Sequence, residues 1–299
     1  MKKAYAIVAL PLFFLAACSK SDEQPNPNED AYLHIPDPHF ETVLVEQGID
    51  TDGTVDQQML RTDAEKLTYL DLSPSGQFGN IADLTGIEGF VNLKFLAASG
   101  QKLEEIDLSA NTQLDTLYLQ ANYLTHIDLA NNPNLLLVNA ESNELTSIEG
   151  LSEATQLKKL YLSFNNVEDL QLDNPDLELL HMGQNLLTSI DISGAVNLKN
   201  IFLISNELTT VDLSQNTLVE TILLSDNAIQ TIDLSHNSNL THLYISSNML
   251  TSLDVSNNHE LIDLRADRNP TLNCIKIGSG QEIPTVSKSD YQELNMVCE

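Results

Sequence analysis

The segment that decides the fold is residues 115–135, DTLYLQANYLTHIDLANNPNL, which returns in residues 199–219 as KNIFLISNELTTVDLSQNTLV. Both stretches contain 21 residues, and their apolar, Asn and Asp residues stand at the same offsets. Further copies, with one-residue slips near Lys158, begin at Lys94, Leu136, Lys158, Glu178, Glu220, Thr241 and Ile262. Repeats of this length are typical of a solenoid, in which each unit buries its apolar side against its neighbours.

Each copy begins with apolar residues at alternating positions, as in Leu117 and Leu119. This period of two predicts a short strand with one buried face in every repeat. An asparagine follows each strand at a fixed offset, at Asn122, Asn143, Asn165, Asn185, Asn206, Asn227, Asn248 and Asn269. Because an amide side chain both donates and accepts, we expect these asparagines to hydrogen-bond backbone groups where the chain leaves the strand.

The spacing of Leu117, Leu119, Asn122 and Leu124 nearly matches LxxLxLxxNxL, and on this ground the chain resembles the leucine-rich-repeat family. The repeat length is similar to that of the short bacterial, internalin-like class. The resemblance covers residues 68–277, and a divergent first copy begins it. It implies a repeat solenoid: a right-handed coil with a parallel β-sheet on the concave face and a thin convex side of turns or extended pieces.

The expected convex side of each repeat carries an acidic residue between two apolar ones. These acids are Asp107, Asp128, Asp191, Asp212, Asp233 and Asp254, with Glu149 and Gln171 in the two slipped copies. Asp before Ser or Ala commonly folds into a turn onto its own backbone. A column of carboxylates also suits divalent cations. Both alternatives stay open here, and turn chemistry is favoured.

Open solenoids need covered ends, and residues 31–67 provide a candidate N-terminal cap. Asp37 and Pro38 precede the apolar Phe40 and Leu44, which predicts a helix with Asp at the N-cap and Pro in the first turn. Residues 278–299 are the predicted C-terminal cap.

A disulfide is predicted at this C-terminal end. Cys274 and Cys298 are the only cysteines besides Cys18, and an exported protein meets oxidising conditions. Similar repeat lipoproteins carry an NPxLxC ending, which residues 269–274 match. Two free thiols are the alternative.

The N-terminus has the pattern of a bacterial lipoprotein signal. Lys2 and Lys3 precede an apolar run, and Leu-Ala-Ala-Cys at residues 15–18 resembles a lipobox. We expect a signal peptide at residues 1–17, a lipid on Cys18 and a flexible tether at residues 18–30. The acidic run behind the cysteine resembles the tag that some Gram-negative bacteria use to send lipoproteins to the outer face, and an ordinary polar linker is the alternative. The sequence therefore predicts an exported protein anchored by lipid to the outer membrane, and leaves open whether it faces the periplasm or the cell surface.

Composition and motifs argue against nucleic-acid binding and catalysis. The chain has 43 Asp and Glu against 14 Lys and Arg, and its formal charge of −29 would repel a phosphate backbone. HExxH, GxSxG, P-loop and CxxC motifs are absent. Residues 50–56, DTDGTVD, are similar to a calcium loop but lack its fifth-position acid and its final Glu, so we interpret them as a turn. We predict no catalytic residues, cofactor or metal.

Strand alternation predicts an outward column of side chains on the sheet. If Leu117 and Leu119 point inward, the residue between them points out. The equivalent residues are Ala97, Tyr118, Asn139, Tyr161, His181, Phe202, Leu223, Tyr244 and Arg265. Exposed apolar columns usually mark an interaction surface, although aromatic residues also favour strands for structural reasons.

We therefore predict a binding module that recognises a protein or glycan. Its predicted binding residues are Tyr118, Tyr161, His181, Phe202 and Tyr244. An adhesive or structural envelope lipoprotein is the second hypothesis, and an enzyme or a metal-binding protein is less favoured.

Overall fold

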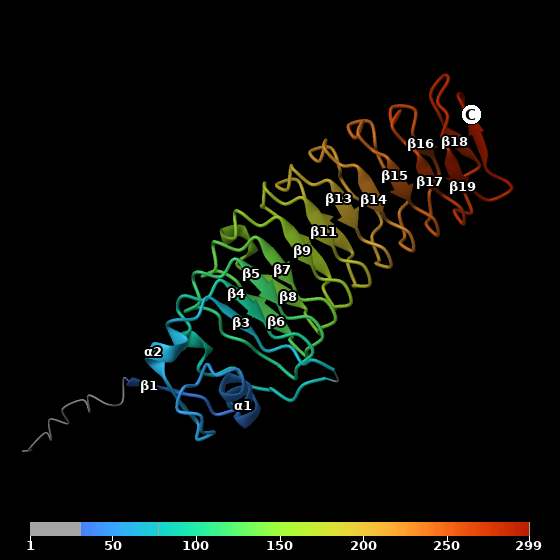
Figure 1. The fold of residues 1–299 in the computed structure, drawn as a ribbon. Helices are drawn as coiled ribbons and strands as arrows, with labels where there is room; N and C mark the ends of the chain where they lie inside the picture. The colour runs from blue at the N-terminus through green and yellow to red at the C-terminus, as the bar shows by residue number, and fades with distance from the viewer. Residues whose placement is uncertain (1–30, 77, 299) are drawn as a thin grey trace, which may run out of the picture.

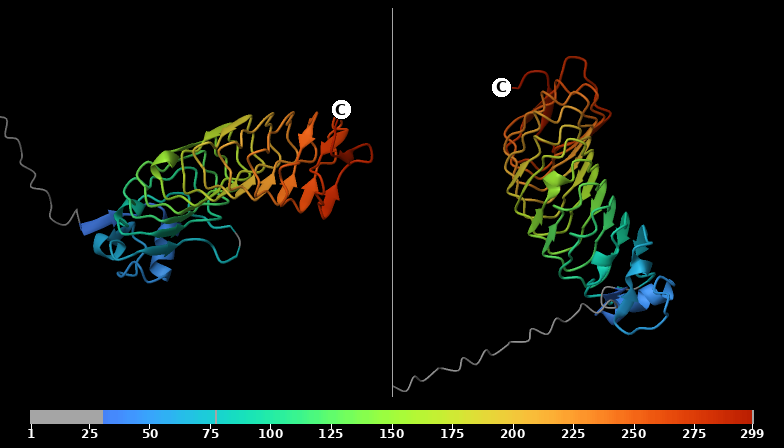
Figure 2. Two further views of the ribbon diagram at one scale, coloured as in Figure 1. Left: turned by 90° about the horizontal axis from the view of Figure 1, so that it is seen from above. Right: turned by 90° about the vertical axis from the view of Figure 1, so that its left-hand side faces the viewer.

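The computed structural model describes residues 31–76 and 78–298, so the predicted signal peptide, the lipidated Cys18 and the tether lie outside the described residues. The chain forms an elongated, curved solenoid whose coils stack along one axis (Figure 1, Figure 2). The predicted repeat solenoid with a parallel sheet is therefore confirmed.

One parallel sheet of 11 strands runs the length of the concave face. Its strands in spatial order are β3 (Tyr69–Asp71), β4 (Phe95–Ala97), β5 (Thr116–Tyr118), β7 (Leu137–Asn139), β9 (Lys159–Tyr161), β11 (Leu179–His181), β13 (Asn200–Phe202), β14 (Thr221–Leu223), β15 (His242–Tyr244), β17 (Asp263–Arg265) and β19 (Thr285–Ser287). The middle residue of nearly every strand is buried, as Leu117 and Leu160 are. Each coil thus adds one thin apolar layer to a continuous core.

The opposite, convex side has only short strands and turns. These strands are β6 (His126–Asp128), β8 (Ser147–Glu149), β10 (Asp169–Gln171), β12 (Ser189–Asp191), β16 (Leu253–Asp254), β18 (Cys274–Lys276) and β20 (Glu293–Asn295). Single 3-10 turns occur at Ile87–Gly89 and Leu151–Glu153. Extended pieces of this kind keep the convex side thin, as expected.

The predicted asparagines form a ladder at the turn that leaves each concave strand. In one coil, Asn165 donates from Nδ2 to the carbonyls of Leu162 (2.9 Å) and Ala140 (3.0 Å), and its Oδ1 accepts from the Leu145 N–H (3.0 Å). The other seven repeat this arrangement, so the predicted backbone role is confirmed. Each amide joins its own coil to the preceding one.

A second asparagine ladder, which the sequence analysis did not single out, occupies the turn that leaves the convex side. Its members are Asn111, Asn132, Asn174, Asn216, Asn237 and Asn258, and all six are fully buried. Asn174, for example, donates to the carbonyls of Leu151 (2.7 Å) and Ala154 (3.0 Å) of the preceding coil. Its Oδ1 has no partner, and the same holds for the other five.

The N-terminal segment lies against the first coils (Figure 1). It contains an antiparallel pair, β1 (Tyr32–His34) and β2 (Gln58–Leu60), with the helices α1 (Pro38–Glu46) and α2 (Arg61–Ala64). Asp37 is the N-cap of α1, as predicted, and accepts from the His39 and Phe40 N–H groups. Its second oxygen accepts from residues 82 and 83 of the repeats, so one carboxylate joins the segment to the solenoid.

At the other end, the sheet continues beyond the boundary predicted at residue 277. Strand β19 pairs with β17, and β20 pairs with β18, so residues 285–295 add another coil to the solenoid. The predicted disulfide between Cys274 and Cys298 is confirmed, with the two Cα atoms 5.7 Å apart. It ties the last described residues to β18.

Candidate functional site

The five predicted binding residues share one column on the concave face. The register pairs Ala97 with Tyr118, and the pairing continues without a shift through every strand to Arg265. The tertiary structure therefore aligns side chains that lie about one repeat apart in sequence. The column is less exposed than predicted: most of its members are half-buried, and Ala97 is buried. Side chains on adjacent strands shield one another, because the strands are only about 4.8 Å apart.

The centre of the column is a cluster of three rings on β9, β11 and β13. The ring of His181 stands edge-on to Tyr161, with centroids 6.1 Å apart, and to Phe202, with centroids 5.4 Å apart. His181 Nδ1 also lies 2.8 Å from a carboxylate oxygen of Glu141. Burial, followed by the charge of Glu141, raises the pKa of Tyr161 above its usual value. The cluster thus presents apolar rings with a neutral phenol and a carboxylate-paired imidazole.

A second group of rings precedes this cluster at the N-terminal end of the sheet. Phe95 stacks on Tyr69 with centroids 4.4 Å apart, and it lies 5.7 Å from the ring of Tyr118. Tyr69 is 58% exposed and was missing from the predicted site. Tyr69 was missed because it lies in the divergent first repeat, which does not align clearly with the others. The buried Leu70 between Tyr69 and Asp71 has the same alternation as the other strands, and this signal could have identified it.

The last predicted residue, Tyr244, is held by its neighbours. Its hydroxyl donates to Asp263 over 2.8 Å, and the guanidinium of Arg265 lies 4.0 Å from its ring centroid. The hydrogen bond to Asp263 raises the pKa of Tyr244, because a phenolate there would face the carboxylate. Its phenol is therefore already used within the chain.

Lysines border the central cluster in a chain with few basic residues. Lys199 Nζ lies 3.0 Å from Glu178, and this bond lowers the pKa of Glu178, with further contributions from Lys158 and Lys159. Three lysines thus lie at this edge of β9, β11 and β13, in a chain whose formal charge is −29.

The acidic column on the convex side forms turns, as favoured from the sequence. Asp191 Oδ1 accepts from both the N–H and the hydroxyl of Ser193, at 3.0 and 2.7 Å. Asp107, Asp128, Asp212, Asp233 and Asp254 accept from the N–H two residues on in the same way. The two hydrogen bonds from Ser193 lower the pKa of Asp191, and the one from the Ser193 hydroxyl contributes most.

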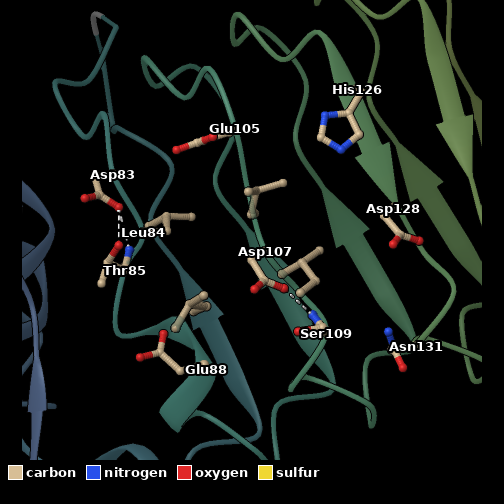
Figure 3. Close-up of a pocket in the computed structure, with 13 residues that line it drawn as sticks. Asp83, Leu84, Thr85, Glu88, Glu105, Asp107, Ser109, His126, Asp128 and Asn131 are labelled. Atoms are coloured by element: carbon tan, nitrogen blue, oxygen red, sulfur yellow. Dashed lines mark hydrogen bonds between the residues drawn. The ribbon is translucent and has the colours of Figure 1, made fainter.

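One pocket of about 540 Å³ opens on this side near the N-terminal end. Figure 3 shows Asp83, Glu105 and Asp107 around it, together with His126 and Asp128, which both belong to strand β6. Within residues 31–76 and 78–298, no group of three or more His, Cys, Asp or Glu is arranged so that it could hold a metal ion. The carboxylates of this pocket are spread along the coils.

The long turn after β3 lines a pocket of about 760 Å³. Its described lining includes Pro74, Phe78, Lys102 and Gln120 but no Asp, Glu, His or Cys. In the part of the chain that the structure describes, no helix is both long and apolar enough to cross a membrane.

Comparisons with known proteins agree with the fold. No protein-family model matches the sequence, and no match is found among curated proteins. The functional domain of InlJ from Listeria monocytogenes, which includes a cysteine ladder, is 25% identical with a TM-score of 0.71. The alignment covers 82% of this chain but only 56% of that domain.

Two further structures share the fold at lower identity. A leucine-rich-repeat protein of Leptospira interrogans is 18% identical with a TM-score of 0.59, over 78% of this chain and 75% of the other. Internalin C2 of Listeria monocytogenes is 20% identical with a TM-score of 0.59, over 75% of this chain and all of the other. The fold is therefore that of leucine-rich-repeat solenoids.

Proposed function

We propose that this chain is a non-catalytic binding module that recognises a protein or glycan on its concave face. The observation that carries the proposal is the central cluster of Tyr161, His181 and Phe202. These three rings project from adjacent strands and remain only half-buried. Folding alone does not require aromatic side chains at outward positions, whereas binding hot spots are enriched in them.

The structural neighbours support the same proposal. They are leucine-rich-repeat proteins, among them internalins. The described chain also offers a rigid frame, because the asparagine ladders fix each coil to the previous one. A rigid frame reduces the conformational entropy lost on binding.

A binding experiment on residues 31–299 tests the proposal. We expect that Tyr161→Ala or Phe202→Ala weakens partner capture by at least about 2 kcal/mol, roughly thirtyfold. His126→Ala, an exposed change on convex strand β6, is the matched control and should leave capture unchanged. Loss of binding in convex variants with no change in the concave ones would move the site to the acidic side and favour a cationic partner.

We further propose that the module is held at the bacterial outer membrane through a lipid on Cys18. The lipobox-like residues 15–18 and the polar stretch behind them support this. A soluble, acidic body needs such an anchor to stay at a membrane. Cys18→Ser should release the protein into the soluble fraction, and its continued sedimentation with membranes would contradict the anchor.

A further inference from the structure

Basic side chains precede the rings of the central cluster on the concave face. On β9, β11 and β13, counted with the residue before each strand, Lys158, Lys159 and Lys199 stand against one carboxylate, that of Glu178. Lys199 pairs with it over 3.0 Å. Lys158 and Lys159 are exposed and form no ion pair among the described residues, although both help to lower the pKa of Glu178. An excess of positive charge therefore remains at this edge.

The carboxylate at the other end of the rings is already engaged. Glu141 lies 2.8 Å from Nδ1 of His181, and its side chain is only 24% exposed. After burial, its charge is the next cause of the raised pKa of Tyr161, whose phenol is therefore neutral. Along the strand direction, the surface thus runs from free lysines through apolar rings to a paired carboxylate.

The spacing of these groups matches that of an extended polypeptide. Lys159 and Tyr161 lie two residues apart on the outward face of β9, which is about 6.6 Å along the strand. Lys199 precedes Phe202 by three residues, or about 10 Å. Residues two or three positions apart in an extended segment span the same distances. A carboxylate and an apolar side chain at this separation in a partner reach the lysines and the rings together.

The orientation of the rings favours a polypeptide over a saccharide at this place. Sugar rings stack on flat ring faces, and such a platform exists at Tyr69 and Phe95, whose planes differ by 11°. In the central cluster, the plane of His181 is turned by 83° from that of Tyr161 and by 87° from that of Phe202. Edge-to-face clusters of this kind accept a further aromatic side chain in the same arrangement.

We propose that the partner is a protein with an acidic segment, in which a carboxylate lies against the three lysines and a nearby aromatic side chain packs on the central cluster. The inference rests on the proposed binding function and adds the chemistry of the partner. Charge complementarity supports it, because complementary potentials steer association and suppress wrong partners. The formal charge of −29 repels an acidic segment from most of the chain, so the lysine edge also selects where such a segment docks.

Binding of the full chain to an immobilised random copolymer of glutamate and tyrosine tests the proposal, with immobilised polyglutamate and polygalacturonate beside it. At an ionic strength of about 0.15 M the screening length is about 8 Å, so local charges outweigh the distant convex acids. We expect the copolymer to bind at least about tenfold more tightly than polyglutamate, which has no rings. Lys158→Glu should weaken copolymer binding at least about tenfold, and Phe202→Ala should remove the preference for the copolymer.

Lys94→Glu is the matched control, because Lys94 holds the place before β4 that Lys158 holds before β9, with the same kind of backbone hydrogen bond. Both lysines are exposed, so neither change should alter thermal unfolding, and Lys94→Glu should keep the affinity for the copolymer. Equal losses in the two lysine variants would mean that only the net charge matters, and would overturn the proposal.

Three further outcomes would also overturn it. Tighter binding to polygalacturonate than to the copolymer would identify an acidic glycan as the occupant. Ring-dependent binding that ignores Lys158→Glu would leave the binding module in place but reject the acidic partner. A copolymer that does not bind at all would do the same, whereas the proposed function itself fails only if the ring variants keep partner capture.

Discussion

The concave and convex sides of each coil come from the same short repeat, yet they use their outward side chains in opposite ways. On the convex side, Asp191 and its equivalents repeat from coil to coil and fold back onto their own backbone. On the concave side, the equivalent positions change from coil to coil, and rings such as Tyr161 and Phe202 pack against the ring of His181. The repeated side chains form the coil, and the varied ones remain available to a partner.

The largest expected effect concerns the core that both faces share. Leu160 is fully buried at the centre of β9, so Leu160→Ala should lower the free energy of unfolding by about 2 to 5 kcal/mol. Urea unfolding measures this loss. A cost below about 1 kcal/mol would mean that the stacked layers collapse around the cavity and that the core is not tightly packed.

The two asparagine ladders should differ in a matched pair of variants. Asn165→Ala leaves the buried N–H of Leu145 without a partner, and it should cost about 2 kcal/mol. The two carbonyls that Asn165 contacts keep donors in the neighbouring ladder residues Asn143 and Asn185. Asn174→Ala removes one of two hydrogen bonds at each of two carbonyls, which keep their backbone N–H donors, and it also removes a buried oxygen that has no partner. We therefore expect about 1 kcal/mol. Ala154 and Ala195 already hold the second-ladder position in their own coils, which supports the smaller cost. Equal costs in urea unfolding would remove the distinction between the ladders.

A smaller effect is expected from the concave rings. Tyr161→Ala removes an outward, half-buried side chain, so the loss of stability should stay within about 0.5 to 1 kcal/mol. Thermal unfolding is the measurement, and the same variant should lose partner binding. A loss of stability as large as that of Leu160→Ala would assign the rings a structural role.

The smallest effects should appear as opposite pH dependences of the two sides. The pKa of Asp107 is lowered, chiefly by the hydrogen bond from the Ser109 hydroxyl. The ionised Asp107 therefore adds to the free energy of unfolding fully above the ordinary pKa of 3.8, and this addition disappears as the pH falls through the lowered pKa. The pKa of Tyr161 is raised, so its neutral phenol adds to the free energy of unfolding fully below pH 10.0, and this addition disappears as the pH rises through the raised pKa. Urea unfolding at a series of pH values measures both effects. Asp107→Asn should make the free energy of unfolding less dependent on pH in the acid range, and Tyr161→Phe should do the same in the alkaline range. Identical profiles for both variants and the wild type would contradict this assignment.

The amino-acid sequence by itself determined the repeat, its strands, the first asparagine ladder and the disulfide partners. Each of these depends on a pattern that is local to one 21-residue unit or, for the cysteines, on a simple count. Even the outward column followed from strand alternation, because a period of two fixes which side chains share a face.

The tertiary structure alone decided how those side chains meet. Separating Tyr244, which Asp263 and Arg265 hold, from the freer rings of Tyr161 and Phe202 required the register between coils. The extra coil at β19 was missed because residues 278–299 lack the leucine spacing of the repeats. The burial of Asp50, whose Oδ2 has no hydrogen-bond partner, depends on the chain folding back over it, and no local pattern encodes which donors reach a buried oxygen.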